Sequence, residues 1–121
     1  MRKALIVGGA NGIGLAIATE LAGRSDFGNI YIVDKAQPEP TLMHEKFVCS
    51  QFDLSASDFS FFDRFTDIDT LIITAGFGKL ALFKDVTEEH IVSSMTVNAT
   101  AVMRLVHHFY DKICSKEEFY C

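Results

Sequence analysis

The sequence predicts an α/β protein: a doubly wound parallel sheet of about four strands with helices on both faces. Short apolar runs typical of strands alternate along the chain with stretches of helical periodicity. This alternation favours parallel pairing through right-handed crossovers, which place helices on both sides of a sheet. The strands are rich in Leu, Ile and Val, which agrees with burial on both faces. The 121 residues suffice for one domain over 1–121 and leave no room for a second core.

Four apolar runs predict the strands of this sheet. The first, 3–7, ends at a glycine pair, and the second, 30–33, is a β-branched and aromatic run. The third, 47–52, is weaker because polar residues interrupt it. The fourth, 71–73, is followed by a glycine that closes it.

Helical periodicity occurs in three segments. Over 12–22 apolar residues recur every four positions, which predicts a helix buried on much of its surface. Over 57–65 three phenylalanines are available for the buried side of a short helix. From Thr87 to about Ile113 the stretch is one kinked helix or two, divided near Asn98, and Thr87 suits its start. Its apolar residues fall on one side: Ile91, Met95, Val102, Leu105, Val106, Phe109 and Ile113.

Charge and composition exclude several classes of partner. The balance of 11 Lys and Arg against 16 Asp and Glu gives −5 without a basic cluster, so we expect no nucleic acid partner. No apolar run reaches the roughly 18 residues of a membrane span. The adjacent His107 and His108 point about 100° apart on a helix, so no metal site is predicted. Cys49, Cys114 and Cys121 lack disulfide spacing and follow no signal peptide, which favours free thiols in a reducing cytoplasm.

A glycine-rich turn lies between the first strand and the first helix. It contains Gly8, Asn11, Gly12, Ile13 and Gly14. Glycines let the backbone approach a pyrophosphate, and the unpaired N–H groups at a helix start bind its charge. The alternative is a tight strand-to-helix turn that holds no ligand.

An acid follows this turn at an informative distance. Asp34 ends the second strand 20 residues after Gly14, where a carboxylate can accept hydrogen bonds from an adenosine ribose. A carboxylate there repels a ribose 2′-phosphate, which favours NAD over NADP, although the adjacent Lys35 weakens this preference. The alternative for Asp34 is a solvated acid at a strand end.

The glycine pattern resembles that of the short-chain dehydrogenase/reductase family. Gly8, Gly12 and Gly14 match its T-G-x-x-x-G-x-G pattern, with Val7 in place of the Thr. The resemblance implies a Rossmann-like NAD(P)-binding domain.

Three further motifs extend the resemblance in order along the chain. Asp53-Leu54 is similar to an Asp-Leu pair whose acid binds the adenine amino group in relatives. Ala75-Gly76 is similar to the end of the N-N-A-G motif, whose asparagines are replaced by Ile73 and Thr74. Asn98 matches the Asn of the family's catalytic set, which holds a water in the proton relay. Taken singly, these residues could be a helix cap, an ordinary strand end and a helix-bending Asn.

The other catalytic residues of the family have no match at the family's positions. Relatives use a Tyr as general acid/base, a Lys four residues later and a Ser on the strand after the long helix. Tyr31 and Lys35 have the right spacing but lie on a strand, where they are about 13 Å apart. We therefore expect the Ser-bearing strand to be absent and the chain to be C-terminally truncated relative to the family.

Two classes of function remain open. The chain is either the NAD-binding portion of an oxidoreductase, whose intact form acts on an alcohol or carbonyl, or a non-catalytic dinucleotide-binding or interaction module. The long helix lies at a subunit interface in relatives. The resemblance therefore implies a homo-oligomer formed through 91–113.

We predict that the 121-residue polypeptide alone has no dehydrogenase activity, because Asn98 is its only match to the family's catalytic set. The measurement is the NAD-dependent absorbance change at about 340 nm with alcohol and carbonyl substrates. A change that survived Tyr31→Phe, Tyr110→Phe and Tyr120→Phe would contradict the view that the unmatched residues are essential.

Overall fold

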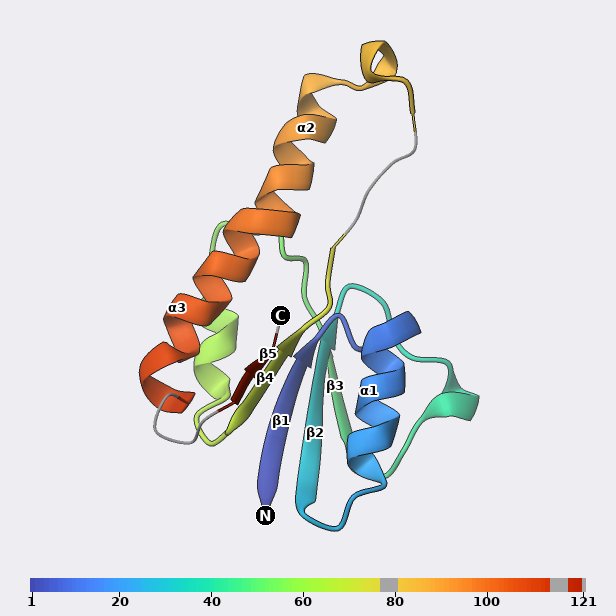
Figure 1. Cartoon of the computed structure of the whole chain (residues 1–121), viewed down its shortest axis with the longest axis vertical. Helices are drawn as coiled ribbons and strands as arrows, with labels where there is room; N and C mark the ends of the chain where they lie inside the picture. Colours follow the sequence, from blue (N-terminus) through green and yellow to red (C-terminus); the bar gives the residue numbers. More distant parts are fainter. Residues whose placement is uncertain (77–80, 114–117, 121) are drawn as a thin grey trace.

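The protein is a five-stranded parallel sheet covered by helices on both faces (Figure 1). The structure is a computed structural model that describes residues 1–76, 81–113 and 118–120. The strands are β1 (Arg2–Val7), β2 (Phe27–Asp34), β3 (Phe47–Gln51), β4 (Thr70–Ile73) and β5 (Glu118–Tyr120). They lie in the order β3-β2-β1-β4-β5, and each pair of neighbours is parallel. The predicted doubly wound α/β fold is confirmed.

The fifth strand differs from the sequence prediction. The sequence predicts about four strands and none after the long helix, whereas β5 follows that helix and pairs with β4 in parallel. Its three residues begin with a glutamate and are too few to show an alternating pattern. No serine lies within β5.

The two faces of the sheet have separate apolar cores. Helix α1 (Gly12–Ala22) covers one face, and α3 (Ala101–Ile113) covers the other (Figure 1). Alternate residues of β1 divide between the two cores, because successive side chains of a strand point to opposite faces. Leu5 packs in the core that contains α3, whereas Ile6 packs in the core that contains α1.

The segment predicted as a helix over 57–65 is a short 3₁₀ helix, Ser60–Arg64. Phe62 N–H donates to the carbonyl of Phe59 at 3.0 Å, and Phe65 N–H donates to the carbonyl of Phe62 at 3.2 Å. A 3₁₀ helix has three residues per turn, so these three side chains lie along one face. All three are buried, and the Phe62 ring also contacts that of Phe109 on α3. Two other 3₁₀ helices span Pro40–Leu42 and Phe83–Asp85.

The long helical stretch is divided where the sequence predicts. Helix α2 (Glu88–Met95) leads through a π-helical turn, Thr96–Thr100, into α3, and Asn98 lies in that turn. The hydroxyl of Thr87 accepts a hydrogen bond from the N–H of His90 at 3.1 Å, which caps α2.

The apolar side predicted for the whole stretch is buried only in α3. Its buried residues are Ala101, Leu105, Phe109 and Ile113. No residue of α2 is buried, and Ile91 and Met95 are exposed. A π turn contains one extra residue, which rotates the faces of the two helices by about 100° relative to each other. In addition, α2 projects beyond the carboxyl ends of the strands, where the sheet offers it no surface (Figure 1).

Two other predictions concern the thiols and the membrane. Cys49, on β3, is a free and half-buried thiol, and burial raises its pKa. Cys114 and Cys121 lie outside the described residues. Among the described residues, no helix is both long enough and apolar enough to cross a bilayer.

The first turn of α1 packs against the end of β1 without space for a side chain. A Cβ added to Gly14 would lie 2.2 Å from the carbonyl oxygen of Gly8 and 2.5 Å from the hydroxyl oxygen of Thr74. Because the nearer atom belongs to the backbone, it cannot move aside without shifting the turn.

We predict that Gly14→Ala destabilises the fold by about 1–3 kcal/mol, since the steric overlap outweighs the roughly 1 kcal/mol by which Ala favours a helix. The measurement is urea unfolding followed by circular dichroism. Gly23→Ala is the matched control, because its Cβ would lie an ordinary 3.5 Å from the carbonyl oxygen of Glu20. Equal stability of the two variants would contradict the packing argument.

Candidate functional site

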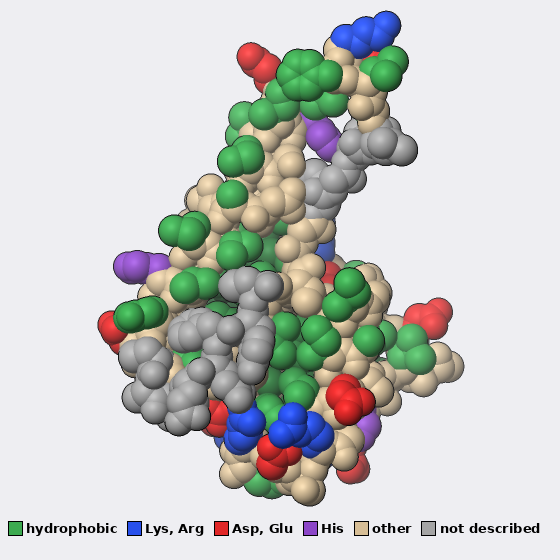
Figure 2. Space-filling model, viewed as in Figure 1, with side chains coloured by type: hydrophobic (Ala, Val, Ile, Leu, Met, Phe, Trp, Pro, Cys, Tyr) green, Lys and Arg blue, Asp and Glu red, His purple; other side chains and the backbone are tan. Residues whose placement is uncertain are grey.

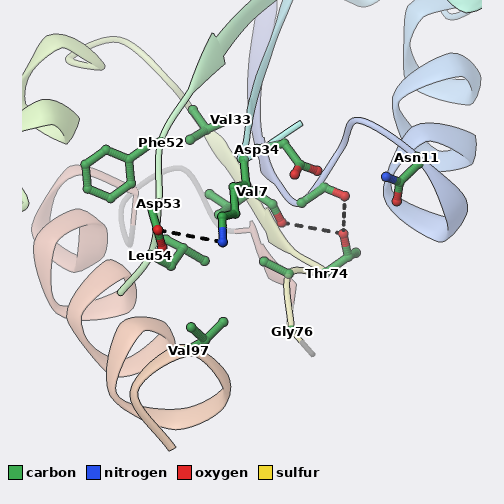
Figure 3. A pocket seen from close by; sticks show the side chains of 13 residues that line it. Val7, Asn11, Val33, Asp34, Phe52, Asp53, Leu54, Thr74, Gly76 and Val97 are labelled. Carbon is green, nitrogen blue, oxygen red and sulfur yellow. Dashed lines mark hydrogen bonds and ion pairs between the residues drawn. The ribbon is translucent and has the colours of Figure 1, made fainter. Parts of the chain in front are cut away.

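A cavity of about 320 Å³ opens at the carboxyl ends of the strands (Figure 3). It lies where β1 has β2 on one side and β4 on the other, the switch point at which doubly wound sheets bind ligands. Four strand ends and the start of the π turn line it: Val7, Gly8, Asn11, Val33, Asp34, Lys35, Phe52, Asp53, Leu54, Thr74, Ala75, Gly76 and Val97.

The glycine turn forms one wall of the cavity. Gly8 has φ +97, a left-handed conformation that favours glycine, and its N–H donates to the carbonyl of Val33 at 2.8 Å. A Cβ there would lie 2.4 Å from the backbone nitrogen of Ala75, so the wall is bare backbone. Helix α1 begins directly after Asn11, and the first N–H groups of a helix have no partners within it. Such a helix start can bind an anion.

Thr74 joins the glycine turn to β4. Its hydroxyl donates to the carbonyl of Gly8 at 3.1 Å, and the carbonyl oxygen of Val7 lies 3.5 Å away (Figure 3). The backbone N–H groups of Thr74 and Ala75 both donate to that Val7 oxygen, at 2.9 and 3.1 Å. Thr74, at a position where the resemblance implies an asparagine, therefore connects the two sides of the switch point.

Asp34 is held at both of its carboxylate oxygens. The N–H of Ala10 donates to Oδ2 at 3.0 Å, and the N–H of Ala36 donates to Oδ1 at 3.1 Å. The first of these bonds ties the carboxylate to the glycine turn. A carboxylate has about four lone-pair sites, so Asp34 keeps acceptor capacity toward the cavity that it lines.

Asp53 lies two residues beyond the end of β3 and lines the same cavity as Asp34. The N–H and hydroxyl of Ser55 donate to its Oδ1 at 2.9 and 2.7 Å. Its Oδ2 lies 3.8 Å from Nζ of Lys35 (Figure 3). The Ser55 hydrogen bonds, with a smaller effect from Lys35, hold the pKa of Asp53 below its ordinary value. Asp53 does not cap the next helix, because that 3₁₀ helix begins only at Ser60.

Asn98 lies beside the cavity rather than in its lining. Its side-chain amide donates to the hydroxyl of Ser94 at 3.1 Å. A Cβ added to Gly76 would lie 2.8 Å from Oδ1 of Asn98, so the π turn approaches the end of β4. Val97, the preceding residue, contributes to the lining.

The cavity brings together eight of the twelve predicted site residues. Those that line it are Gly8, Asn11, Asp34, Lys35, Asp53, Leu54, Ala75 and Gly76. The other four, Gly12, Ile13, Gly14 and Asn98, lie next to it in the chain or in space; Gly12 has φ +56, and Ile13 is 75% exposed in the first turn of α1. The sequence prediction did not include Val7, Val33, Phe52, Thr74 and Val97. Alignment of the strand ends could have found Val7, Val33, Phe52 and Thr74, since each lies at the end of a strand and directly precedes a predicted site residue.

The described part of the chain has no group of three or more potential metal ligands.

His108 faces the 3₁₀ helix Ser60–Arg64, with Nε2 3.7 Å from a carboxylate oxygen of Asp63. Burial, with a smaller effect from Lys112, lowers its pKa.

Comparison with known proteins shows consistent relatives. The family described as "short chain dehydrogenase" matches residues 2–118. A 3-oxoacyl-[acyl-carrier protein] reductase from Brucella melitensis is 27% identical, with a TM-score of 0.74. The matched region covers 97% of this chain and 52% of that protein. A bulky-bulky ketone specific alcohol dehydrogenase from Comamonas testosteroni is 27% identical, with a TM-score of 0.76. The matched region covers 88% of this chain and 47% of that protein.

A short chain dehydrogenase from Leptospira borgpetersenii with bound NAD⁺ is 22% identical with a TM-score of 0.76. In that comparison 91% of this chain covers 45% of the other. No curated protein sequence matches the chain. The chain spans about half the length of these solved structures. Since the family match covers almost all of its residues, the chain belongs to the short chain dehydrogenase family.

Proposed function

We propose that the chain binds a nicotinamide dinucleotide, NAD in preference to NADP, as the cofactor-binding portion of a short-chain dehydrogenase-type oxidoreductase. The observation that carries the proposal is the cavity at the switch point, with a bare glycine turn on one side and the oriented carboxylate of Asp34 on the other. Bound there, the nicotinamide would supply the chemistry of hydride transfer.

Most of the predicted site residues have a proposed task. The N–H groups of Gly12, Ile13 and Gly14 at the start of α1 bind the pyrophosphate, which approaches the backbone because Gly8 has no side chain. Asp34 accepts hydrogen bonds from the adenosine ribose. By family resemblance, Asp53 and the apolar Leu54 contact the adenine.

The proposed residues on the other side of the switch point are Ala75, Gly76 and Asn98. Ala75 and Gly76 line the cavity at the end of β4, where bare or small residues leave room for the cofactor. Asn98 is the proposed member of the catalytic set. A Cβ built on Gly76, which lines the cavity, would lie close to Oδ1 of Asn98, and this supports a position near the bound cofactor.

The names of the relatives support oxidoreductase chemistry in the intact form. The Brucella protein is a reductase of a 3-oxoacyl group, and the Comamonas protein is an alcohol dehydrogenase specific for bulky ketones. The Leptospira structure contains NAD⁺. We propose an alcohol or carbonyl substrate for an intact form, and a cytoplasmic location in keeping with the free Cys49 thiol.

A second candidate is a non-catalytic dinucleotide-binding or interaction module. The observation that favours it is the row of exposed apolar side chains along α2 and α3 (Figure 2). Met103 is 72% exposed and Val92 64% exposed. Met103, Val106 and Tyr110 also line a shallow hollow of about 400 Å³. Exposed apolar patches recruit partners, so we propose a homo-oligomer formed through 91–113.

A substitution at Asp34 tests its role in cofactor binding. Asp34→Asn removes the charge while keeping one acceptor oxygen, and we expect about tenfold weaker NAD binding with a smaller loss for NADP. Isothermal titration calorimetry of both dinucleotides measures this. Asp58→Asn is the matched control, because Asp58 accepts a similar bond from the N–H of Ser60 at 2.8 Å and does not line the cavity. Unchanged NAD affinity in Asp34→Asn, or no NAD binding by the wild type, would contradict the proposal.

Sedimentation of the wild type and of an interface variant tests self-association. We expect the wild type to sediment as an oligomer at tens of micromolar and Met103→Glu to shift it toward monomer, because a charge in an apolar interface must lose its hydration. Leu42→Glu is the control, since Leu42 is an exposed apolar residue on a different element. A wild type that sediments as a clean monomer would exclude this interface.

A further inference from the structure

We propose that Asp53 strengthens the preference for NAD by pairing with Lys35, so that this lysine is not available to neutralise a ribose 2′-phosphate. The inference rests on the proposed function, because it concerns the same cavity. It assigns Asp53 a role in discrimination between cofactors, in addition to the adenine contact that the family resemblance implies.

Backbone pairing of β2 with β3 brings Lys35 and Asp53, which follow the ends of these strands, close to each other. Strands β2 and β3 are parallel, and Asp34 is in register with Gln51. Beyond that pair, the N–H of Phe52 donates to the carbonyl of Asp34 at 3.0 Å, and the side-chain amide of Gln51 donates to the carbonyl of Lys35 at 3.2 Å. Continued by one residue, this register places Phe52 opposite Lys35 and Asp53 directly after it, so the sheet brings Lys35 and Asp53 to the same end of the cavity independently of any ligand.

The carboxylate of Asp53 is oriented before a ligand binds. Both hydrogen bonds from Ser55 reach Oδ1, which leaves Oδ2 on the side of Lys35, 3.8 Å from its Nζ. The same bonds keep the pKa of Asp53 below its ordinary value, so the group is ionised near neutrality. The pair therefore has a fixed anion and a cation on a long stem that is 78% exposed.

The charges at this end of the cavity decide which ribose is favoured. Asp34 and Asp53 contribute two negative charges, and Lys35 contributes one positive charge among the residues that line the cavity. A phosphate monoester brings about −1.5 to −2 near neutrality, so it meets a net negative group whose cation is already paired. A ribose 2′-hydroxyl has no charge and suffers no such repulsion. Asp53 acts on the phosphate through Lys35, and it is a positioning residue in this respect.

Asp53→Asn tests the pairing with little change of shape. Asparagine keeps an oxygen that can accept the Ser55 hydrogen bonds, while the charge next to Lys35 is lost. The lysine, on its flexible stem, can then turn toward a 2′-phosphate. Because exposed ion pairs are weak, we expect the ratio of NADP affinity to NAD affinity to rise by about two- to fivefold.

The ratio separates this role from the others. Loss of an adenine contact or a distortion of the loop would weaken NAD and NADP equally, since both contain the same adenine, and the ratio would not change. Lys35→Gln provides the second half of a double-mutant cycle. In that background, the proposal predicts that Asp53→Asn changes the ratio much less than it does in the presence of Lys35.

The experiment is calorimetric titration of NAD and NADP into the wild type, Asp53→Asn, Lys35→Gln and the double variant at one ionic strength. A rise in the ratio that depends on Lys35 supports the pairing. An unchanged ratio in Asp53→Asn, or an equal rise with and without Lys35, overturns it while NAD binding and the proposed function stand. If the wild type binds neither dinucleotide, the proposed function fails, and this inference fails with it.

Discussion

The carbonyl oxygen of Val7 connects the two halves of this fold. It accepts hydrogen bonds from two successive N–H groups, those of Thr74 and Ala75, at the point where the chain turns from β1 into the glycine loop. Strands β1 and β4 are neighbours in space although more than sixty residues separate them in the chain. The junction is close-packed, and the Thr74 hydroxyl adds a third connection through Gly8. This junction fixes the position of the glycine turn relative to Thr74, Ala75 and Gly76, which line opposite sides of the cavity.

The requirement for glycine follows from that close approach. The loop backbone at Gly8 and the helix start at Gly14 lie so near to β4 and to each other that any side chain would separate them. The same closeness leaves polar backbone groups at the edge of the cavity, where no side chain covers them. One steric constraint therefore produces both the stability of the junction and a surface suited to an anion.

Much of this arrangement could be predicted from the sequence. Parallel strands bring their carboxyl ends to one edge, so the residues that follow each apolar run, such as Gly8, Asp34 and Ala75, had to converge. The pairing of Lys35 with Asp53 could not be predicted, because it depends on the register between β2 and β3 and on the Ser55 hydrogen bonds. The pattern of residue types within β2 does not state which residue of β3 each of its residues pairs with.

The differences from the predicted elements have tertiary causes. The segment around Phe62 adopts a three-residue period because its aromatic rings must all reach the core under α3. Local helix propensity takes no account of such a tertiary contact. The strand β5 becomes a strand only through its pairing with β4. In both cases the partner lies far away in the chain, and a local pattern cannot report it.

The π turn at Thr96–Thr100 contains one residue more than an α-helical turn would. This extra residue sets the directions in which the side chains of α2 point. Removal of one residue from the turn would restore an unbroken α-helical ladder and swing α2 by about a quarter of a revolution about its axis. Each direction around α2 would then be occupied by side chains that now lie about 100° away on the helix. The extra residue thus sets the rotation of α2 about its axis. Insertion or loss of one amino acid here would change which side chains of α2 are exposed without altering the sheet.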